Sequence, residues 1–359
     1  MNYKETLFFV AKCLTISLED KNRQAIEAQL QAETIDWDAV VKVSTSHYVF
    51  PALYCNLKRV DLLKYVPNDL VVYMEHITDL NRDRNLQIIE QAKELNKLLL
   101  ANNITPIFLK GTGNLLEGLY IDIAERMVGD IDFIVSKEHY PRAIEILLNH
   151  KYNTKTKIKE KYVYPFRHYP RLTKFNEIAA IEIHSELVID KYTPEFNYIL
   201  IHSDVQKINN LTVLSFEHQM VLTIIATQIN DLGFHYKNMA LRNAYDIFVL
   251  SKKVNAKSTI SKFNKLRNLL NCFLASSYIT FGTVSSLEYE PSKETVKYLQ
   301  IYNDLLLNEK KRNSKRKLID TQLFIKNKFS NLYRFFFDEK YRVWKLNKEF
   351  MIKIRNVIN

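Results

Sequence analysis

The chain has 359 residues, 47% of them hydrophobic, which suffices for two or three packed units and excludes a disordered protein. It contains only 6 glycines and 8 prolines, about 4% of the residues where roughly 12% is usual, so turn-rich sandwiches and collagen-like repeats are excluded and helices are favoured. The formal net charge is +11, and residues 309–359 alone carry 15 Lys and Arg against 5 Asp and Glu, so the basic excess lies almost entirely in the C-terminal tail.

Three widely separated cysteines, Cys13, Cys55 and Cys272, form neither a disulfide framework nor a Cys-x-x-Cys metal knuckle, so we expect buried thiols in a reducing compartment. The chain contains no stretch of about 18 uninterrupted apolar residues, which predicts that no segment spans a membrane. Charged residues interrupt the N-terminal apolar run and no small-residue cleavage site follows it, so this run predicts an amphipathic helix. We therefore expect a cytoplasmic protein.

Helices are predicted for the first hundred residues. The longest runs from about 67 to 102, where apolar residues recur every three or four positions and form one face. The residues of this face are Leu86, Ile89, Ala92, Leu95, Leu98 and Leu99. Residues 1–102 are expected to form an N-terminal helical segment.

Between about 103 and 190 the periodicity changes to that of strands. TPIFLKG (105–111) is a short apolar run ended by glycine, whereas GDIDFIV (129–135) and AAIEIHSEL (179–187) alternate apolar with polar residues over part of their length. Residues 113–122 and 140–150 fit helices between these strands. We predict an α/β core, built on a small mixed sheet, over residues 103–212.

Helices return after about residue 213. Ser215 is expected to cap the first of them, and further helices are predicted within 239–253, 260–282 and 292–307. Residues 213–308 would form a C-terminal helical domain and residues 309–359 a basic, aromatic-rich helical tail, separated by a linker near 310–317. The predicted fold class is α+β, a small mixed-sheet core flanked by N-terminal and C-terminal helical segments.

Asp130 and Asp132 lie two residues apart in the second predicted strand, so both carboxylates project from one face of it. Two hard oxygen donors suit Mg²⁺, with Mn²⁺ as an alternative, because an ion held this way keeps positions for water and for substrate phosphate oxygens. A solvated strand face explains most Asp-x-Asp pairs, so this pair by itself does not define a metal site.

The first predicted strand ends in Lys110-Gly111-Thr112-Gly113 and opens into a helix. Glycines let backbone amides approach an anion closely, and a helix N-terminus directs unpaired N–H groups towards it, so this turn is a candidate phosphate cradle. The Thr112 hydroxyl would add a donor, and Lys110 or Arg126 would neutralise phosphate charge. The alternative is an ordinary strand-to-helix turn with structural glycines.

Glu182 and His184 share one face of the third predicted strand. A carboxylate on a neighbouring strand would complete a metal cluster or serve as general base for an attacking hydroxyl. The alternatives are a surface carboxylate for Glu182 and hydrogen-bonded structural histidines for His184 and His168. Asp246 is expected to be structural, near a helix–helix contact and paired with Arg242, and the alternative is that these two residues line the cleft.

Three motifs together resemble the DNA-polymerase-beta-like nucleotidyltransferase superfamily: FLKGTG, the spacing from Arg126 to the two aspartates, and IEIHSEL. More closely, the chain resembles a bacterial branch of uncharacterised nucleotidyltransferase-family proteins over roughly residues 35–285. Tyr120 stands at the branch's tyrosine position. Thr112 replaces the more usual serine and Ser185 a common aromatic residue, but neither change removes a metal ligand.

The resemblance implies a Mg²⁺-dependent enzyme that transfers a nucleoside monophosphate from a nucleoside triphosphate to a hydroxyl acceptor, which is a small molecule, a protein or an RNA. It implies that Asp130, Asp132 and Glu182 are catalytic metal ligands and that Gly111 and Thr112 contact phosphate. The alternative is a catalytically inactive protein of the same fold that binds nucleic acid or a protein partner. A toxin or defence component is a third interpretation.

The tail interleaves Lys and Arg with aromatic residues from Phe324 to Phe350. Basic charge attracts phosphate and aromatic faces stack on bases, so an RNA contact is one interpretation, and an amphipathic helix on an anionic membrane surface is another. A helix that packs its aromatic residues on the body is the third. The similar stretch 155–175 is expected to be a substrate-facing loop or hairpin, or an exposed connection.

Overall fold

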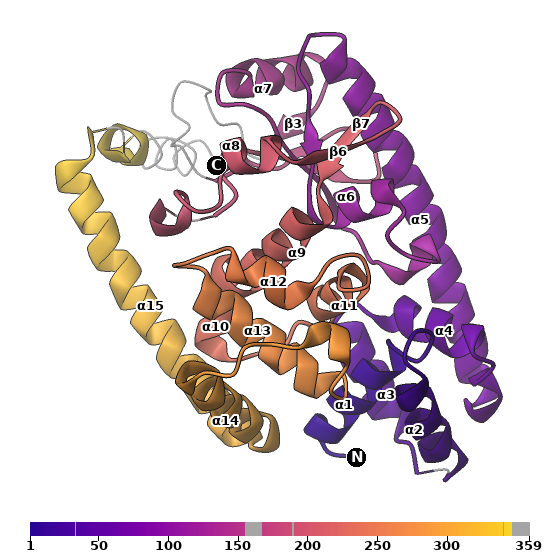
Figure 1. Cartoon of the computed structure of the whole chain (residues 1–359). Coiled ribbons are helices and arrows are strands. Elements are labelled where there is room, and N and C mark those ends of the chain that lie inside the picture. Colours follow the sequence, from indigo (N-terminus) through magenta and orange to yellow (C-terminus); the bar gives the residue numbers. More distant parts are fainter. Residues whose placement is uncertain (33, 155–166, 189, 340, 347–359) are drawn as a thin grey trace, which may run out of the picture.

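The structure is a computed structural model that describes residues 1–32, 34–154, 167–188, 190–339 and 341–346 (Figure 1). Within these residues the centre is a seven-stranded mixed sheet of order β3-β4-β5-β2-β1-β7-β6. The strands are β1 (Ile107–Phe108), β2 (Asp130–Ile134), β3 (Asn153–Thr154), β4 (Leu172–Thr173), β5 (Ala180–His184), β6 (Val205–Ile208) and β7 (Leu211–Leu214). Helices precede and follow the sheet along the chain, which confirms the predicted α+β class.

β2 and β5, the strands predicted to carry the acidic residues, are parallel neighbours. Their register pairs Asp132 with Glu182 and Ile134 with His184. Because paired residues project from the same face, the acidic side chains of both strands share one face of the sheet. The alternate side chains are fully buried and fix this register from the core side: Ile131, Phe133, Ile181 and Ile183.

The N-terminal helices are α1 (Tyr3–Cys13), α2 (Asp20–Gln31), α3 (Trp37–Ser46), α4 (Phe50–Arg59), η1 (Leu63–Tyr65) and α5 (Asn68–Leu100). In Figure 1, α5 runs the length of one flank of the molecule, from the N-terminal helices to the sheet. Its predicted apolar face is only partly correct. Ala92, Leu95 and Leu99 are buried, but Leu86 is 50% exposed and the buried face instead includes four amides.

These buried amides fasten α5 to the core by side-chain hydrogen bonds to backbone carbonyls. Asn81 donates to Ala124 and Asn85 to Ile123 and Arg126, while Gln91 donates to Ala179 and Asn96 to Asn210. A buried amide without such a partner would be costly, so each bond specifies the position of a loop relative to the helix. The bonds of Asn81 and Asn85 hold the segment that leads into β2.

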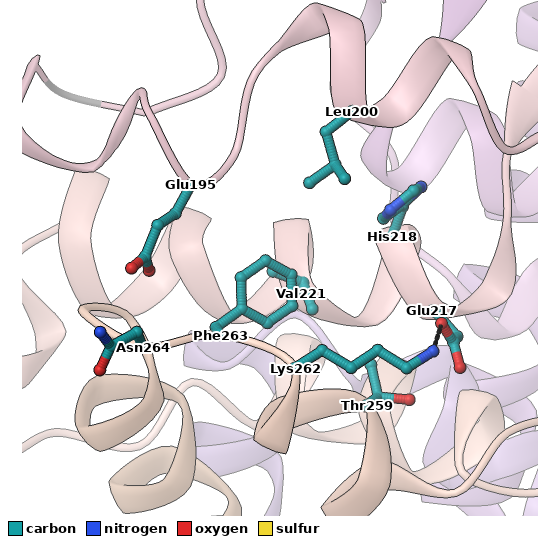
Figure 2. A pocket seen from close by; sticks show the side chains of 9 residues that line it. All are labelled: Glu195, Leu200, Glu217, His218, Val221, Thr259, Lys262, Phe263 and Asn264. Atoms are coloured by element: carbon teal, nitrogen blue, oxygen red, sulfur yellow. Dashed lines mark hydrogen bonds and ion pairs between the residues drawn. The ribbon is translucent and has the colours of Figure 1, made fainter.

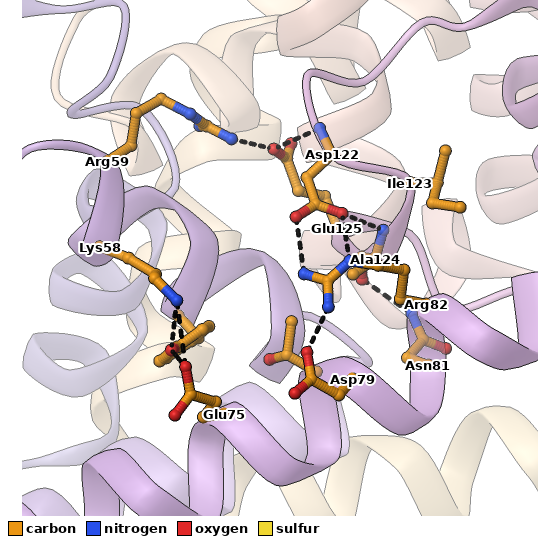
Figure 3. A network of polar contacts seen from close by, with 12 residues as sticks. Lys58, Arg59, Glu75, Asp79, Asn81, Arg82, Asp122, Ile123, Ala124 and Glu125 are labelled. Carbon is orange, nitrogen blue, oxygen red and sulfur yellow. Dashed lines mark hydrogen bonds and ion pairs between the residues drawn. The ribbon is translucent and has the colours of Figure 1, made fainter.

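A network of ion pairs holds η2 (Ile123–Glu125) from the other side (Figure 3). Arg82 of α5 donates to both carboxylate oxygens of Asp122, at 3.2 and 2.7 Å. Glu125 is only 2% exposed and accepts from Arg59 of α4 and, at 2.6 Å, from the hydroxyl of Tyr245. The approach to β2 is thereby tied both to the N-terminal helices and to the helices that follow the sheet.

The helices within the α/β part are α6 (Lys110–Glu117), α7 (Tyr140–Asn149), η4 (Asp190–Tyr192) and α8 (Tyr198–His202). α7 confirms the helix predicted for 140–150, whereas α6 ends at Glu117 with Gly118 at a positive φ, so only the first half of the helix predicted for 113–122 forms. α6 begins at Lys110, however, so the strand predicted for 105–111 is reduced to the two residues of β1. β6 and β7 form an antiparallel hairpin that was not predicted, because apolar and polar residues do not clearly alternate in this stretch.

The C-terminal elements are α9 (Phe216–Ile225), the π-helix η5 (Ala226–Asn230), α10 (Gly233–Tyr236), α11 (Leu241–Leu250), α12 (Ala256–Ser261), α13 (Arg267–Thr280), η6 (Ser285–Leu287), α14 (Lys293–Leu307) and α15 (Glu309–Phe337). Ser215 caps α9 by accepting from the His218 amide, as predicted. The linker predicted at 310–317 is wrong. This stretch has no glycine or proline, Asn308 caps it, and it forms the first turns of α15.

One continuous cluster of buried apolar residues reaches from Leu7 to Leu306, so the flanking helices share their core with the sheet. The four-segment division at 102, 212 and 308 stays a prediction. Cys13, Cys55 and Cys272 are buried free thiols, as expected. None of the helices in the described part of the chain is both long and apolar enough to cross a membrane.

Glu117, the last residue of α6, makes stability depend on pH. Burial raises its pKa to about 7, and Gln206 donates to its Oε1 at 2.6 Å. Because the folded-state pKa exceeds the unfolded one, this carboxyl favours folding at low pH and that contribution is lost as the pH rises through 7. Glu117→Gln, which keeps the acceptor for Gln206, is expected to raise the free energy of unfolding at pH 8 by roughly 1 kcal/mol, after allowance for solvent screening.

Urea denaturation of both proteins at pH 5 and pH 8 tests this expectation. The gain from Glu117→Gln should be much smaller at pH 5, where the wild-type carboxyl is already protonated in the folded state. An equal gain at both pH values would contradict a raised pKa.

Candidate active site

The acidic side chains of β2 and β5 meet on the sheet face that these two central strands share. One carboxylate oxygen each from Asp132 and Glu182 and one ring nitrogen of His184 lie within 4.8 Å of one another. The three residues are 8%, 7% and 2% exposed. Asp130, at the start of β2, is not a member of this group. The structure thus brings two of the three predicted carboxylates together with an accessory histidine.

Two protein cations offset the repulsion among these carboxylates. Lys110 donates to Asp132 at 2.6 Å and lies 4.0 Å from a Glu182 oxygen. Arg171 bridges the other two, with Nη2 at 2.7 Å from Asp130 and Nε at 2.6 Å from Glu182. Carboxylates this close repel one another when charged, and the cationic side chains of Lys110 and Arg171 reduce that repulsion.

Burial and hydrogen bonding set the protonation of the cluster. Burial alone would raise the pKa of Asp132, but the Lys110 ammonium and the His184 hydrogen bond outweigh it and hold that pKa below its usual range. Burial lowers the pKa of His184, so its ring is neutral at pH 7. An ionised carboxylate only accepts, so we assign the proton to Nε2 of His184, which donates to Asp132 at 2.8 Å.

This assignment leaves Nδ1 of His184 as a buried lone pair that has no partner among the described residues. His184 therefore orients Asp132 through one nitrogen while the other faces the interior. His168 packs against it, with ring centroids 5.4 Å apart, and its own Nδ1 lies 2.9 Å from the Tyr169 carbonyl oxygen.

Two residues of the glycine turn (110–113) line a cavity beside the carboxylates, and the other two pack behind it. Lys110 and Gly111 line the cavity, and Lys110 has a positive φ of 52°, an uncommon backbone state for a residue with a side chain. Thr112 is 1% exposed and donates its hydroxyl to the Asp130 carbonyl at 2.9 Å. A Cβ on Gly113 would lie 2.9 Å from the Phe108 carbonyl oxygen, so close packing of α6 on β1 requires glycine there.

Arg126 and Tyr120 both converge on Asp246. Arg126 donates from Nε to the two Asp246 oxygens at 2.9 and 3.0 Å, and the Tyr120 hydroxyl donates to the same carboxylate at 2.6 Å. The predicted pairing of Asp246 with Arg242 is therefore wrong. Asp246 is 1% exposed and paired with Arg126, whereas the Arg242 guanidinium lies over the Tyr48 ring at 5.1 Å.

These groups line a cavity of about 430 Å³ between the sheet and the segment formed by α9, η5 and α11. Its wall is strongly charged, with five cationic and five acidic side chains among the described residues: Lys110, Arg126, Arg167, Arg171 and Arg242, and Asp130, Asp132, Glu182, Asp231 and Asp246. A cavity of this size and polarity fits a charged small molecule better than an apolar one.

Sequence reasoning missed Arg167, Arg171 and Asp231. β4 is antiparallel to β5 with Leu172 opposite Ile181, so the preceding residue, Arg171, falls opposite Glu182. That pairing partner could not be read from the alternation of either strand alone. The predicted substrate-facing stretch 155–175 lies outside the described residues up to 166, and its remaining part supplies Arg167, His168 and Arg171 to the cavity.

Arg171 is expected to compete with a divalent cation for the carboxylates of Asp130 and Glu182. Removing this competitor in Arg171→Gln should tighten Mn²⁺ binding several-fold in the absence of nucleotide, by about 1 kcal/mol. Electron paramagnetic resonance titration of free Mn²⁺ measures the affinity. Lys174→Gln is the control, because it removes the lysine that directly follows β4 and pairs with Glu177. Weaker Mn²⁺ binding to Arg171→Gln would show that the arginine organises the site instead.

A second cavity of about 320 Å³ lies between α8, α9 and the α12–α13 region (Figure 2). Its acidic groups have structural partners. Glu217 pairs with Lys262, and Glu195 accepts from the backbone amides of Lys265 and Leu266. It shares no lining residue with the first cavity, and the metal-capable group of β2 and β5 lies in the first one.

The site thus combines carboxylates from two adjacent parallel strands of a mixed sheet with a glycine-containing strand-to-helix turn. A family model described as "Uncharacterised nucleotidyltransferase" matches residues 33–283, more than half of the chain, and the chain belongs to this family. The match runs from just before α3 to just after α13 and so contains the whole sheet and the cavity. A search of curated proteins finds no match.

Proposed function

We propose that the protein catalyses the metal-dependent transfer of a nucleoside monophosphate from a nucleoside triphosphate to the hydroxyl of an acceptor, which is a small molecule, a protein or an RNA. In this reaction the acceptor oxygen bonds to the α-phosphorus as the bond from that phosphorus to pyrophosphate breaks. The observation that carries the proposal is the convergence of Asp132 and Glu182, with Asp130 beside them, at a cavity rich in arginine.

The residues fit a divalent cation. Asp132 and Glu182 would hold Mg²⁺, or Mn²⁺, with Asp130 as the third carboxylate, because hard cations prefer oxygen ligands. Such an ion supplies charge stabilisation at the phosphate oxygens. Lys110 and Arg171 would have to release their carboxylates. The Arg171 side chain is 60% exposed and that of Lys110 27%, so both are free to turn towards the cavity.

The charges of the cavity wall support a polyanionic substrate. Its five cationic and five acidic side chains balance, so a bound divalent cation gives the cavity a positive excess. Arg167 and Arg242 have no ion pair with any residue in the described ranges, and Nε of Arg242 is buried without a partner. A nucleoside triphosphate, with negative charge spread over three phosphates, would satisfy both guanidinium groups.

Arg242 is therefore expected to bind substrate phosphate. The Arg126 cation beside it, together with burial, lowers the Arg242 pKa to about 10, so the guanidinium is still charged at pH 7 and gains from an anionic partner. Arg242→Gln should weaken nucleotide binding about tenfold in the presence of metal, the loss of one charge-assisted contact. Isothermal titration measures it, with Lys253→Gln on the exposed turn after α11 as control. Unchanged nucleotide affinity would rule Arg242 out as a phosphate contact.

Titration of the wild type with each nucleoside triphosphate, with and without Mg²⁺ or Mn²⁺, tests the proposed function. At least one nucleotide should bind only when metal is present, and Asp132→Asn should remove that binding. Binding that is absent, or independent of metal, would contradict the proposal. Metal-dependent binding without transfer to any acceptor would favour the inactive binding protein.

A further inference from the structure

Among the long helices in the described part of the chain, α15 alone contributes nothing to the core, since none of its 29 residues is buried. In Figure 1 it runs along the side of the molecule away from α5. Its first turns are held on the body, where Lys311 pairs with Asp304 at 2.5 Å and the Tyr236 hydroxyl donates to Asp320. Beyond Asp320 most side chains of the helix are exposed.

Large apolar side chains follow one face of this exposed helix. They occur at positions 318, 325, 329, 332 and 336, and spacings of seven, four, three and four residues place them above one another. We call this set the apolar stripe: Leu318, Ile325, Phe329, Leu332 and Phe336, which are 58%, 49%, 69%, 54% and 61% exposed. At 1.5 Å per residue the stripe is about 27 Å long. Soluble surfaces rarely expose a continuous apolar strip of this length without a partner.

The same helix is strongly basic. It carries nine Lys and Arg against two acidic residues, Glu309 and Asp320. On the helical wheel Lys326 and Lys328 fall on opposite sides of the apolar stripe, so the stripe is flanked by positive charge. An apolar face bordered by lysines is the pattern of helices that lie in the plane of an anionic membrane.

We propose that α15 docks the protein on an anionic lipid surface, with the apolar stripe at the boundary between headgroups and acyl chains and the flanking lysines against the headgroup phosphates. The family match ends at residue 283, before α14 and α15, so this helix is an addition to the unit that carries the cavity. The inference concerns where the protein acts and does not depend on the proposed reaction.

Two other occupants fit the stripe less well. RNA bases stack on aromatic side chains. Three of the five residues of the apolar stripe, Leu318, Ile325 and Leu332, are aliphatic and cannot stack on a base. A second copy of α15 would bring two helices of equal positive charge together, which opposes association at ordinary salt concentration. An anionic lipid surface can bind both the aliphatic residues, at its acyl chains, and the positive charge, at its headgroups.

Flotation of the full chain with vesicles tests the proposal. Vesicles of phosphatidylcholine alone are compared with vesicles of equal parts phosphatidylcholine and phosphatidylglycerol. We expect binding to the anionic vesicles that weakens as salt is raised. Phe329→Gln/Phe336→Gln should reduce it about tenfold or more, because two exposed aromatic anchors of the stripe are lost. Lys326→Gln/Lys328→Gln should reduce binding to anionic vesicles, since each lysine near the surface contributes about 1 kcal/mol.

The matched control is Phe324→Gln/Phe337→Gln. These two phenylalanines are 61% and 75% exposed, on the same helix but off the stripe, so their removal should change vesicle binding less than twofold. Equal losses from both double variants would overturn the docking geometry. Failure of the wild type to bind anionic vesicles would overturn the proposal. RNA would then be the occupant if a single-stranded RNA binds the wild type and binds the Phe329→Gln/Phe336→Gln variant more weakly. A second copy of the chain would be the occupant if the wild type is a dimer and that variant is a monomer.

Discussion

Replacing Asp132 by Asn is expected to weaken Mn²⁺ binding about a hundredfold or more, because the substitution removes one of two closely spaced anionic ligands while preserving shape. Asp132 is 8% exposed, and one of its carboxylate oxygens lies within 4.8 Å of a Glu182 oxygen and a His184 ring nitrogen that could bind the same ion. Lys110 and His184 hold the pKa of Asp132 below its usual range. Few sites retain a hard cation on a single carboxylate. Electron paramagnetic resonance titration of free Mn²⁺, with competition by Mg²⁺, measures the change.

Glu182→Gln should cause a loss of similar size, since Glu182 is the registered partner of Asp132 across the two strands. The matched control is Glu186→Gln, which neutralises a carboxylate two residues beyond His184 that pairs with Lys137 and does not line the cavity. Its Mn²⁺ affinity should equal that of the wild type. Equal affinity in all of these proteins would place the metal, if one binds, elsewhere in the chain.

Asp246→Asn is expected to cost about 3–5 kcal/mol of folding free energy, the largest stability effect expected for a single substitution. Asp246 is 1% exposed and Arg126 5%, and the carboxylate is the partner of the buried guanidinium at 2.9 Å. Asparagine leaves that cation uncompensated and weakens the acceptor of the Tyr120 hydroxyl. The cost arises from the charge left behind, and urea denaturation followed by circular dichroism measures it.

The double variant Arg126→Met/Asp246→Leu separates this cause from loss of volume. Removing both charges should recover most of the stability lost in Asp246→Asn, because no unpaired charge stays buried. Glu90→Gln, which removes an exposed partner of Lys93, should cost less than about 0.5 kcal/mol. A double variant less stable than Asp246→Asn would contradict the account.

The two strands that carry the site could be predicted because the pattern that identifies each strand lies within one short run of residues. In β2 the apolar residues alternate with Asp130 and Asp132, and in β5 they alternate with Glu182 and His184, so local periodicity identified both the strand and the face. The same reasoning located Ser215 as a helix cap, where one side chain and the amide three residues on decide the geometry.

Features that depend on a distant partner could not be predicted. Arg171 neutralises Asp130 and Glu182 only because β4 pairs with β5 in one register, which no local pattern encodes. Polar residues such as Asn85 are typical of a solvent-facing helix surface in the sequence. In the structure Asn85 is buried and donates to loop carbonyls. Asp246 has Arg242 at the helical spacing, but the pair that forms is with Arg126, 120 residues earlier in the chain.

Transfer of label from each α-³²P nucleoside triphosphate into the small-molecule, protein and RNA fractions of a cell lysate tests the central claim most directly. The wild type with Mg²⁺ or Mn²⁺ is compared with Asp130→Asn/Asp132→Asn, after both are shown to fold. We predict labelled material in one fraction with the wild type alone, together with release of pyrophosphate. Equal labelling by the double variant, or no labelling by the wild type in any fraction with any nucleotide, would contradict nucleotidyl transfer by this site.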